Sequence, residues 1–332
     1  MKKAIGVIVW IAALCVCLAL ADSFFRREEG AKKYDAFFAE EEQLDVLFLG
    51  SSRVLDGVSP MELWRDYGIT SYNMGNSSEC MDATEWVLRI ASAHNKPKIA
   101  MIDLYYISRS IEDEWHIPYR HLFLDEIRLS PMKIKAVTST IPKAYWTEFL
   151  MPFSLYHGRW EEMLAGTVEP TVDCEPFMMG SELRIGRYPA EDYVRTEEMD
   201  TSEQPGTAAL RRIVNYCREQ GIEPVLMAIP APISEEEQRI MNGMQLVADE
   251  LGVPYVNMQA DNPVDYAADC YDDVGHLNPD GASKTTAYIG RWLTEQYDLE
   301  DKRGSAALSH WDDSLVLYEE FRLANWGHMT ME

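Results

Sequence analysis

The sequence predicts an α/β fold: a three-layer α/β/α sandwich in which helices cover both faces of a central parallel sheet. Short apolar runs, typical of buried parallel strands, occur at five places. These runs are residues 45–50, 70–74, 98–106, 224–229 and 254–258. Segments with helical spacing alternate with them, at 59–68, 82–94, 206–220, 234–252 and 282–297. Repeated strand–helix units of this kind form a parallel sheet between two helical layers.

Residues at the ends of several elements support these boundaries. Ser59 has the side chain of a helix N-cap, Pro60 suits the first helical position, and Gly68 suits the position after the last turn. The first two strands run directly into Gly50 and Gly75, and a glycine lets the backbone turn sharply after a strand.

The N-terminus predicts export of the chain. Lys2 and Lys3 precede an uninterrupted apolar run at residues 4–21. As a helix this run is about 27 Å long, close to the hydrocarbon thickness of a bilayer. The two lysines favour a cytoplasmic start, with the rest of the chain outside. We expect residues 1–21 to be a transmembrane anchor; the alternative is a signal peptide that is cleaved after Ala21.

The remaining chain divides into three segments. Residues 22–43 are charged with scattered aromatics and are expected to form a stalk or a short helix that leads into the domain. Residues 44–300 are expected to form the α/β domain. The strand–helix alternation pauses at about 107–200, where we expect a mainly helical insertion over the sheet. The acidic tail at 301–332 is expected to contain a helix packed on the domain.

Composition favours some partners over others. The chain has 332 residues, 47% of them hydrophobic, which is enough for a sizeable core. Its formal net charge of -25 repels nucleic acid and anionic lipid headgroups, so a weakly charged substrate such as a glycan fits better. Cys80, Cys174, Cys217 and Cys270 show no CxxC spacing, so no zinc site is expected. Disulfides and buried free thiols both remain open for them.

The first predicted strand ends in Gly50-Ser51-Ser52-Arg53. In an open parallel sheet, ligands bind beyond the carboxyl ends of the strands. A serine held at a sharp strand-to-helix turn exposes its hydroxyl, as a nucleophile requires. Ser52 is therefore the candidate nucleophile; the alternative is that Ser51 and Ser52 only cap the helix that follows.

A second candidate group lies in the loop before the last predicted helix. Asp273 and His276 are three residues apart, so on a turn the carboxylate can reach the imidazole and fix its tautomer. His276 can then take the proton from a serine hydroxyl and later return it. The alternative is that the aspartates are solvated turn residues. Because the first and last strand–helix loops open on the same edge of a sheet, we expect Ser52, His276 and Asp273 to meet there.

These motifs resemble the SGNH (GDSL-like) hydrolase superfamily. The resemblance rests on Gly50-Ser51-Ser52, on Asn73-Met74-Gly75, and on Asp273-x-x-His276 with its Leu-Asn-Pro-Asp-Gly continuation. It covers about 44–106 and 206–297. The Gly-Ser-Ser variant with an N-terminal anchor looks like the envelope-associated branch, which includes the D-alanyl-lipoteichoic acid biosynthesis protein and the alginate O-acetylation proteins. The resemblance implies ester hydrolysis or acyl transfer on cell-surface polymers.

The resemblance also implies roles for the matching residues. Ser52 would be the nucleophile, His276 the base, Asp273 the orienting carboxylate, and the Gly75 N–H an oxyanion donor. One such donor stabilises a transition state by roughly 3 kcal/mol.

The third block departs from the family pattern. The family normally has Gly-x-Asn-Asp after the third strand, whereas this chain has Asp103-Leu104-Tyr105-Tyr106. The missing asparagine leaves a third oxyanion donor to be found. The candidates are the side chains of Asn76 or Ser77 and the hydroxyl of Tyr105 or Tyr106. Capping of the next helix is the alternative for Asn76 and Ser77.

Three further features are candidates for substrate contact. Arg53 could pair with a substrate carboxylate or phosphate, or form a structural salt bridge. Tyr105 and Tyr106 are weaker candidates. The segment 156–160 (YHGRW) mixes aromatic and polar residues as sugar-binding surfaces do, and buried packing is its alternative.

The sequence thus predicts an extracytoplasmic serine esterase or O-acyltransferase that acts on acyl groups, with acetyl favoured, of a cell-envelope glycan. This chemistry needs no metal or organic cofactor. One alternative is an inactive accessory protein of the same fold that binds glycan or a membrane O-acyltransferase. A secreted lipase is the other alternative.

Overall fold

The computed structural model describes residues 2–25, 31–110, 117–152, 154, 174–191 and 195–327. Its centre is a sheet of five parallel strands in the order β2-β1-β3-β4-β5. The strands are β1 (Val46–Leu49), β2 (Ser71–Asn73), β3 (Ile99–Asp103), β4 (Glu223–Ala228) and β5 (Tyr255–Asn257). All five coincide with predicted strands, so the predicted parallel sheet is confirmed.

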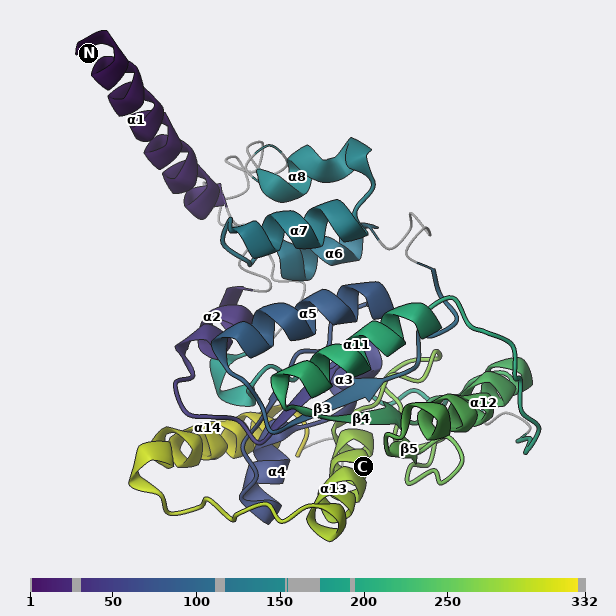
Figure 1. Ribbon diagram of the computed structural model, residues 1–332. Helices are drawn as coiled ribbons and strands as arrows, with labels where there is room; N and C mark the ends of the chain where they lie inside the picture. The colour runs from purple at the N-terminus through teal and green to yellow at the C-terminus, as the bar shows by residue number, and fades with distance from the viewer. Residues whose placement is uncertain are drawn as a thin grey trace. The chain divides into compact units, whose positions relative to one another are not determined.

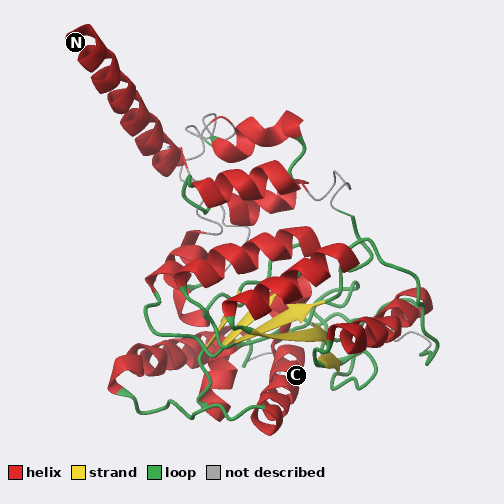
Figure 2. Cartoon of the chain, viewed as in Figure 1, coloured by secondary structure: helices red, strands yellow, loops and turns green. Residues whose placement is uncertain are grey.

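Helices cover both faces of this sheet (Figures 1 and 2). On one face lie α5 (Met81–His94) and α11 (Thr207–Gln220). On the other lie α4 (Pro60–Tyr67) and α13 (Pro279–Gln296), with the short α3 (Ser52–Gly57) against α13. The helix α12 (Glu235–Leu251) packs beside β5. The three-layer α/β/α fold is therefore confirmed.

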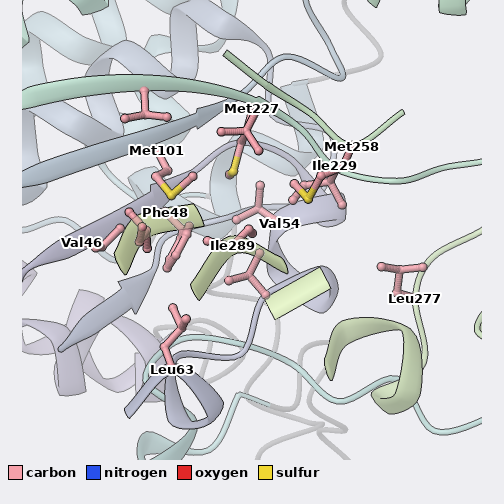
Figure 3. Packing of buried hydrophobic residues seen from close by; sticks show 14 of the residues in the cluster. Val46, Phe48, Val54, Leu63, Met101, Met227, Ile229, Met258, Leu277 and Ile289 are labelled. Carbon is pink, nitrogen blue, oxygen red and sulfur yellow. The ribbon is translucent and has the colours of Figure 1, made fainter. Parts of the chain in front are cut away.

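The core follows from this layering. Every residue of β1 is buried, as expected for a parallel strand with a helical layer on each face. Alternate residues point to opposite faces, and Val46 and Phe48 pack in one cluster with Met101, Met227 and Ile289 of α13 (Figure 3). The sheet and α13 are thereby fixed to each other, and with them the loops at their ends.

The predicted helical insertion is only partly helical. Its first half contains α6 (Ile117–Leu124), α7 (Pro131–Thr140) and α8 (Trp146–Leu150), preceded by the 3-10 turn η2 (Lys143–Tyr145). His121 stacks on Phe149 within this part, with ring centroids 3.8 Å apart. Apart from the 3-10 turn η4 (Pro176–Met178), the described residues between 174 and 206 form neither helix nor strand. The segment at 156–160 lies outside the described residues.

The N-terminal run forms the helix α1 (Lys2–Phe25). Within the part of the chain that the structure describes, no helix has the length and apolar composition required to cross a membrane. The anchor stays a prediction.

Within the segment predicted as a stalk or a short helix, α2 (Ala31–Ala39) is a short helix, and it belongs to the α/β unit from Lys32 onward. Its Tyr34 and Phe37 are fully buried, and the Phe37 ring contacts the Tyr72 ring edge to face at 5.0 Å. These aromatic residues belong to the core although charged residues flank them in the sequence. The helix α2 is therefore part of the folded unit and not a free linker.

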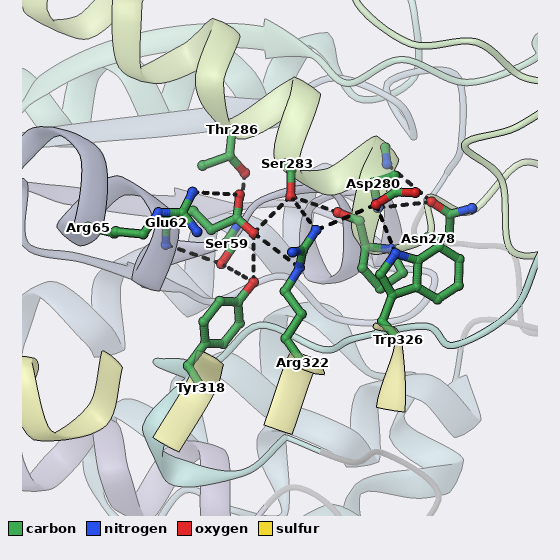
Figure 4. Close-up of polar contacts among 12 residues, drawn as sticks. Ser59, Glu62, Arg65, Asn278, Asp280, Ser283, Thr286, Tyr318, Arg322 and Trp326 are labelled. Atoms are coloured by element: carbon green, nitrogen blue, oxygen red, sulfur yellow. Dashed lines mark hydrogen bonds and ion pairs between the residues drawn. The ribbon is translucent and has the colours of Figure 1, made fainter. Parts of the chain in front are cut away.

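The acidic tail packs on the domain, as predicted, through η5 (Ala306–Leu308) and α14 (Ser309–Asn325). Figure 4 shows side chains of α14 directed at α4 and α13. The Tyr318 hydroxyl donates to Glu62 Oε1 at 2.9 Å, and Trp326 Nε1 donates to Asp280 Oδ1 at 2.8 Å. Buried polar groups are thus paired across this contact, which makes the tail part of the folded unit.

We expect Trp311→Ala in α14 to lower the free energy of unfolding by about 3–5 kcal/mol. Trp311 is fully buried, packs on Trp64 at 5.5 Å and donates to Glu40 Oε2 at 3.1 Å. Leu323→Ala on the same helix is the control, because Leu323 is 68% exposed and its loss should cost less than about 0.5 kcal/mol. Urea denaturation measures both, and equal values would contradict the docking of α14.

Candidate active site

Ser52 lies at the sharp turn between β1 and α3. Gly50 has φ +143°, and a Cβ at this residue would lie 2.7 Å from the Cβ of Asp103, so only glycine fits the turn. Ser51 is the helix N-cap, and its Oγ accepts a hydrogen bond from the Arg53 N–H at 3.3 Å. The capping role therefore falls to Ser51 alone. Ser52 is the first helical residue, and its side chain points elsewhere.

The Ser52 hydroxyl meets the imidazole of His276. Ser52 Oγ is 2.9 Å from His276 Nε2, although 224 residues separate them in the chain. On the far side of the ring, His276 Nδ1 is 2.6 Å from Asp272 Oδ2. With the Nδ1 hydrogen donated to this carboxylate, Nε2 keeps a lone pair that can accept the serine proton. This is the hydrogen-bond order of a serine hydrolase triad.

The carboxylate in this chain of hydrogen bonds is Asp272 and not the predicted Asp273. Residues 272–275 form a turn closed by the Gly275 N–H and the Asp272 carbonyl oxygen at 3.1 Å. Asp273 is the first corner of this turn and is exposed, whereas Asp272 faces back toward the ring. Asp272 Oδ1 also accepts the backbone N–H of His276 at 2.9 Å. The four-residue separation of Asp272 and His276 allows the carboxylate to bond both the ring and the backbone N–H of His276. This separation is the only sign in the sequence that Asp272 is the partner.

The loop that carries His276 has a fixed internal shape. The Tyr271 N–H donates to the His276 carbonyl oxygen at 2.7 Å, and Cys270 pairs with Leu277 in an antiparallel bridge. Gly275 has φ +80°, and a Cβ there would lie 2.1 Å from Cδ of Pro232. The turn therefore depends on glycine between the carboxylate and the imidazole.

The surroundings favour the neutral imidazole. Burial lowers the pKa of His276, the positive charge of Arg53 lowers it further, and the contact with Asp272 opposes both. For Asp272, burial favours the neutral acid, but the hydrogen bonds from the ring and the backbone of His276 outweigh it and lower its pKa. Near neutral pH the pair is thus an ionised carboxylate beside a neutral histidine, ready to accept a proton.

Neither predicted oxyanion donor is free in this structure. The Gly75 N–H donates to Asn73 Oδ1 at 2.9 Å. Asn76 is buried, and its side-chain nitrogen donates to the Met74 carbonyl oxygen at 3.0 Å and to Glu79 Oε2 at 2.6 Å. The side-chain amide of Asn76 therefore hydrogen-bonds within the protein, and no contact between it and Ser52 is seen.

Capping does not explain Asn76 and Ser77 either. The helix α5 is capped by Cys80, without a side-chain hydrogen bond, and Ser77 is partly exposed in the preceding turn. The Ser52 N–H makes no hydrogen bond within the described residues, as expected at the first position of a helix. This amide is the donor that the geometry leaves available next to the nucleophile.

The helix α2 braces the loop after β2. Lys33 is buried, and its Nζ donates to the Gly75 carbonyl oxygen at 2.6 Å, while the Tyr34 hydroxyl donates to Asn76 Oδ1. Burial lowers the pKa of Lys33 and raises that of Glu79 to about 8. Sequence reasoning missed this contact because it assigned α2 to a stalk.

The predicted substrate contacts are arranged differently from expectation. Arg53 is only 3% exposed, so it is not placed to receive a substrate anion directly. It forms no salt bridge with a described residue, and its Nη2 donates to the hydroxyl of Tyr105 at 3.3 Å. The Tyr105 hydroxyl keeps its own hydrogen free to donate, which makes it a remaining candidate for the third oxyanion donor. Tyr106 is hydrogen-bonded to Ser78 instead.

Asp103 ties three strand ends together below the site. Its Oδ2 accepts from Ser51 Oγ at 3.4 Å and from the Tyr105 N–H at 3.3 Å, and its Oδ1 accepts from the Ile229 N–H at 3.2 Å. Burial raises its pKa to about 6, against the opposing effect of these hydrogen bonds. Asp103 therefore holds the turn that presents Ser52 against the ends of β3 and β4.

The cysteines form no disulfides among the described residues. Cys80, Cys174, Cys217 and Cys270 are buried free thiols, which decides between the two alternatives left by the sequence. Among the residues that the structure describes, no group of three or more His, Cys, Asp or Glu side chains is arranged to hold a metal ion.

Comparison with known proteins adds no family: no family model matches the chain, and neither does any curated protein. The assignment of a function therefore rests on the geometry around Ser52.

Proposed function

We propose that the protein is a serine esterase or O-acyltransferase that acts on ester-linked acyl groups of a cell-envelope glycan. The observation that carries the proposal is the chain of hydrogen bonds from Ser52 through His276 to Asp272, with distances of 2.9 Å and 2.6 Å. Convergence of three such groups at the carboxyl edge of a parallel sheet is the arrangement that acyl transfer needs.

The chemistry follows from the positions of the protons. Ser52 Oγ attacks the ester carbonyl carbon while its proton passes to His276 Nε2, and Asp272 stabilises the imidazolium that forms. The proton then goes to the leaving sugar oxygen, which departs and leaves an acyl group on Ser52. Water or a second sugar hydroxyl gives its proton to Nε2 and takes the acyl group, and His276 returns that proton to the departing Ser52 Oγ. Hydrolase and transferase thus use the same residues and differ in the acceptor.

A polar hollow lined largely by the loop after β5 is a candidate subsite for a polar substrate. It has a volume of about 580 Å³, and its lining includes Arg195, Asp261, Asn262 and Tyr266. It borders the long loop that follows β5 and runs on to His276. Its polar side chains can hydrogen-bond sugar hydroxyls, and the formal net charge of -25 favours a weakly charged sugar.

We also propose that the α/β unit lies outside the cytoplasmic membrane, attached by α1. The support is the apolar run behind Lys2 and Lys3, together with exposed apolar side chains along α1 such as Val9 and Trp10, 61% and 67% exposed. Protease added to intact spheroplasts should then digest the α/β unit, and protection until lysis would contradict this location.

One observation favours a second candidate, an inactive accessory protein that binds glycan or a membrane O-acyltransferase. The Gly75 N–H and the Asn76 amide, which the family resemblance assigns to the oxyanion, both have partners inside the protein. Loss of a single oxyanion donor lowers kcat by about 10²–10³-fold, so a site without these donors would be a weak catalyst.

A fluorophosphonate probe separates the two candidates. The purified full-length protein should be labelled at Ser52, and Ser52→Ala should abolish the label while Ser51→Ala keeps part of it. Ser51 is a matched control because it is adjacent and donates only to Asp103. Absence of labelling in the unaltered protein would favour the accessory candidate. Incubation with an O-acetylated glycan then distinguishes loss from transfer of acetyl, and a preference for long-chain p-nitrophenyl esters would indicate a lipase instead.

We expect activity to persist well into mildly acidic pH. His276 must be neutral to accept the serine proton, and its pKa is lowered below the ordinary value of about 6.5 by burial and by Arg53. The acid limb of kcat/KM should therefore have its midpoint below pH 6.5. A pH profile with p-nitrophenyl acetate measures this, and a midpoint above pH 7 would contradict the assigned environment.

A further inference from the structure

Arg53 is the residue after Ser52 and connects two parts of the site. Its Nη2 donates to the Val274 carbonyl oxygen at 2.6 Å and to the Tyr105 hydroxyl at 3.3 Å. The guanidinium carbon lies 4.7 Å from the centre of the Tyr105 ring, in cation–π range. A single buried side chain on α3 therefore contacts both the loop that carries His276 and the segment after β3.

The bond to Val274 holds the tip of a loop that is otherwise exposed. Val274 lies between Asp272 and His276 and is 54% exposed, so packing does little to fix it. The hydrogen bonds within the loop fix its internal shape but not its position over Ser52. Leu277 is buried in the core at the far end of the loop. Gly275 packs closely on Pro232, and the Arg53–Val274 bond adds a further fixed point for the loop, at the helix that carries the nucleophile.

The charge of Arg53 is not neutralised by direct contact. It makes no ion pair with a described carboxylate, and its Nε and Nη1 are buried without a hydrogen-bond partner among the described residues. An arginine stays protonated in proteins, so a buried positive charge acts on His276 from the helix that carries Ser52. Arg184 acts on His276 in the same sense, and the carboxyl groups of Asp56 and Asp272 interact with the charge of Arg53 at longer range. Such a charge favours the negative oxygen of a tetrahedral intermediate and disfavours premature protonation of His276.

We propose that Arg53 is a positioning residue: it holds the Asp272–His276 loop over Ser52 and biases the site toward the anionic transition state. This inference rests on the proposed function and deepens it. A positioning role explains why Arg53 is buried, since an arginine that binds substrate directly would be exposed. It also supplies electrostatic stabilisation at a site where the Gly75 N–H and the Asn76 amide are engaged inside the protein.

The test compares Arg53→Gln, Arg53→Lys and Tyr105→Phe in the full-length protein. For Arg53→Gln we expect kcat with p-nitrophenyl acetate to fall about 10²-fold, because a small displacement of reacting groups has effects of this size, with KM little changed. Removing the positive charge lets His276 keep its proton to higher pH, so the acid limb should move upward. Arg53→Lys should return the acid limb toward its original position while recovering only part of kcat. Tyr105→Phe keeps the charge of Arg53 and its bond to Val274, so its acid limb should stay where it is in the unaltered protein.

A loss of kcat with an unmoved acid limb would reduce Arg53 to a structural residue and overturn the proposal, as would an unchanged kcat. Arg322→Gln is the matched control, because Arg322 on α14 likewise has a buried Nε without a hydrogen-bond partner but pairs with Glu62 away from the site. It should leave kcat and the pH profile unchanged.

The proposal also has a readout that does not need catalysis. The NMR titration of the His276 ring should move to higher pH in Arg53→Gln, and an unmoved titration would refute the electrostatic role even in an inactive protein. Fluorophosphonate labelling of Ser52 in the unaltered protein tests the proposed function separately. The two ideas can therefore fail independently.

Discussion

Asp272→Asn should lower kcat by about 10⁴-fold, whereas Asp273→Asn should leave it within about twofold. The two residues are adjacent and chemically identical, yet only Asp272 Oδ2 contacts His276 Nδ1, at 2.6 Å. An asparagine at 272 can present its NH2 group to Nδ1, which then becomes the acceptor and moves the ring hydrogen to Nε2. A protonated Nε2 cannot take the proton of Ser52, so the geometry survives while the base is lost.

The pair of variants is its own control for folding and charge, since each removes one negative charge from the same turn. Single-turnover kinetics with p-nitrophenyl acetate measure the acylation step directly. A large loss in Asp273→Asn with little effect of Asp272→Asn would restore the assignment that the sequence suggested. It would also mean that the turn rearranges when substrate binds.

The strands and the meeting of Ser52 with His276 could be predicted because each follows from a local pattern and one topological rule. Residues 46–49 are apolar without alternation, and in the structure helices cover both faces of that strand. Once the strands are parallel, the loops after the first strand and before the last helix must open on one edge. Contact between α3 and α13 then brings residues 52 and 276 together.

The choice between Asp272 and Asp273 could not be made from the sequence. It depends on the conformation of a four-residue turn, which is set by Gly275 at φ +80° and by Pro232 from a distant segment. A shift of one residue along a turn reverses the direction of a side chain. Spacing alone therefore identified the turn but not the carboxylate.

The oxyanion donors were beyond sequence reasoning for a different reason. The Asn76 amide is engaged by Glu79, and the loop that holds both is fixed by Lys33 and Tyr34 from α2. Because charged residues flank the aromatics of α2, the sequence pattern did not show that one face of this helix is buried. A buried polar group satisfies its hydrogen bonds with whatever neighbour the tertiary structure supplies, and here that neighbour came from a segment taken for a stalk.

The largest effect is expected from His276→Ala, which should lower kcat/KM by about 10⁶-fold, similar to the loss in Ser52→Ala. The imidazole is the only described base within hydrogen-bond distance of Ser52 Oγ, at 2.9 Å from Nε2. His310→Ala is the matched control: His310 also contacts a carboxylate, Glu40 at 3.0 Å, but lies on α14 outside the site. It should retain full activity in the same assay.

The double variant Ser52→Ala/His276→Ala makes the sharper test of a shared mechanism. Because the hydroxyl and the imidazole act in one proton transfer, removing the second after the first should cost almost nothing further. Independent contributions would instead multiply, and the double variant would be far slower than either single one. Multiplying losses would mean that the 2.9 Å contact between Ser52 and His276 is structural, and that any activity arises from other groups. A double variant no slower than the single ones would show that catalysis depends on the hydrogen bond between Ser52 and His276.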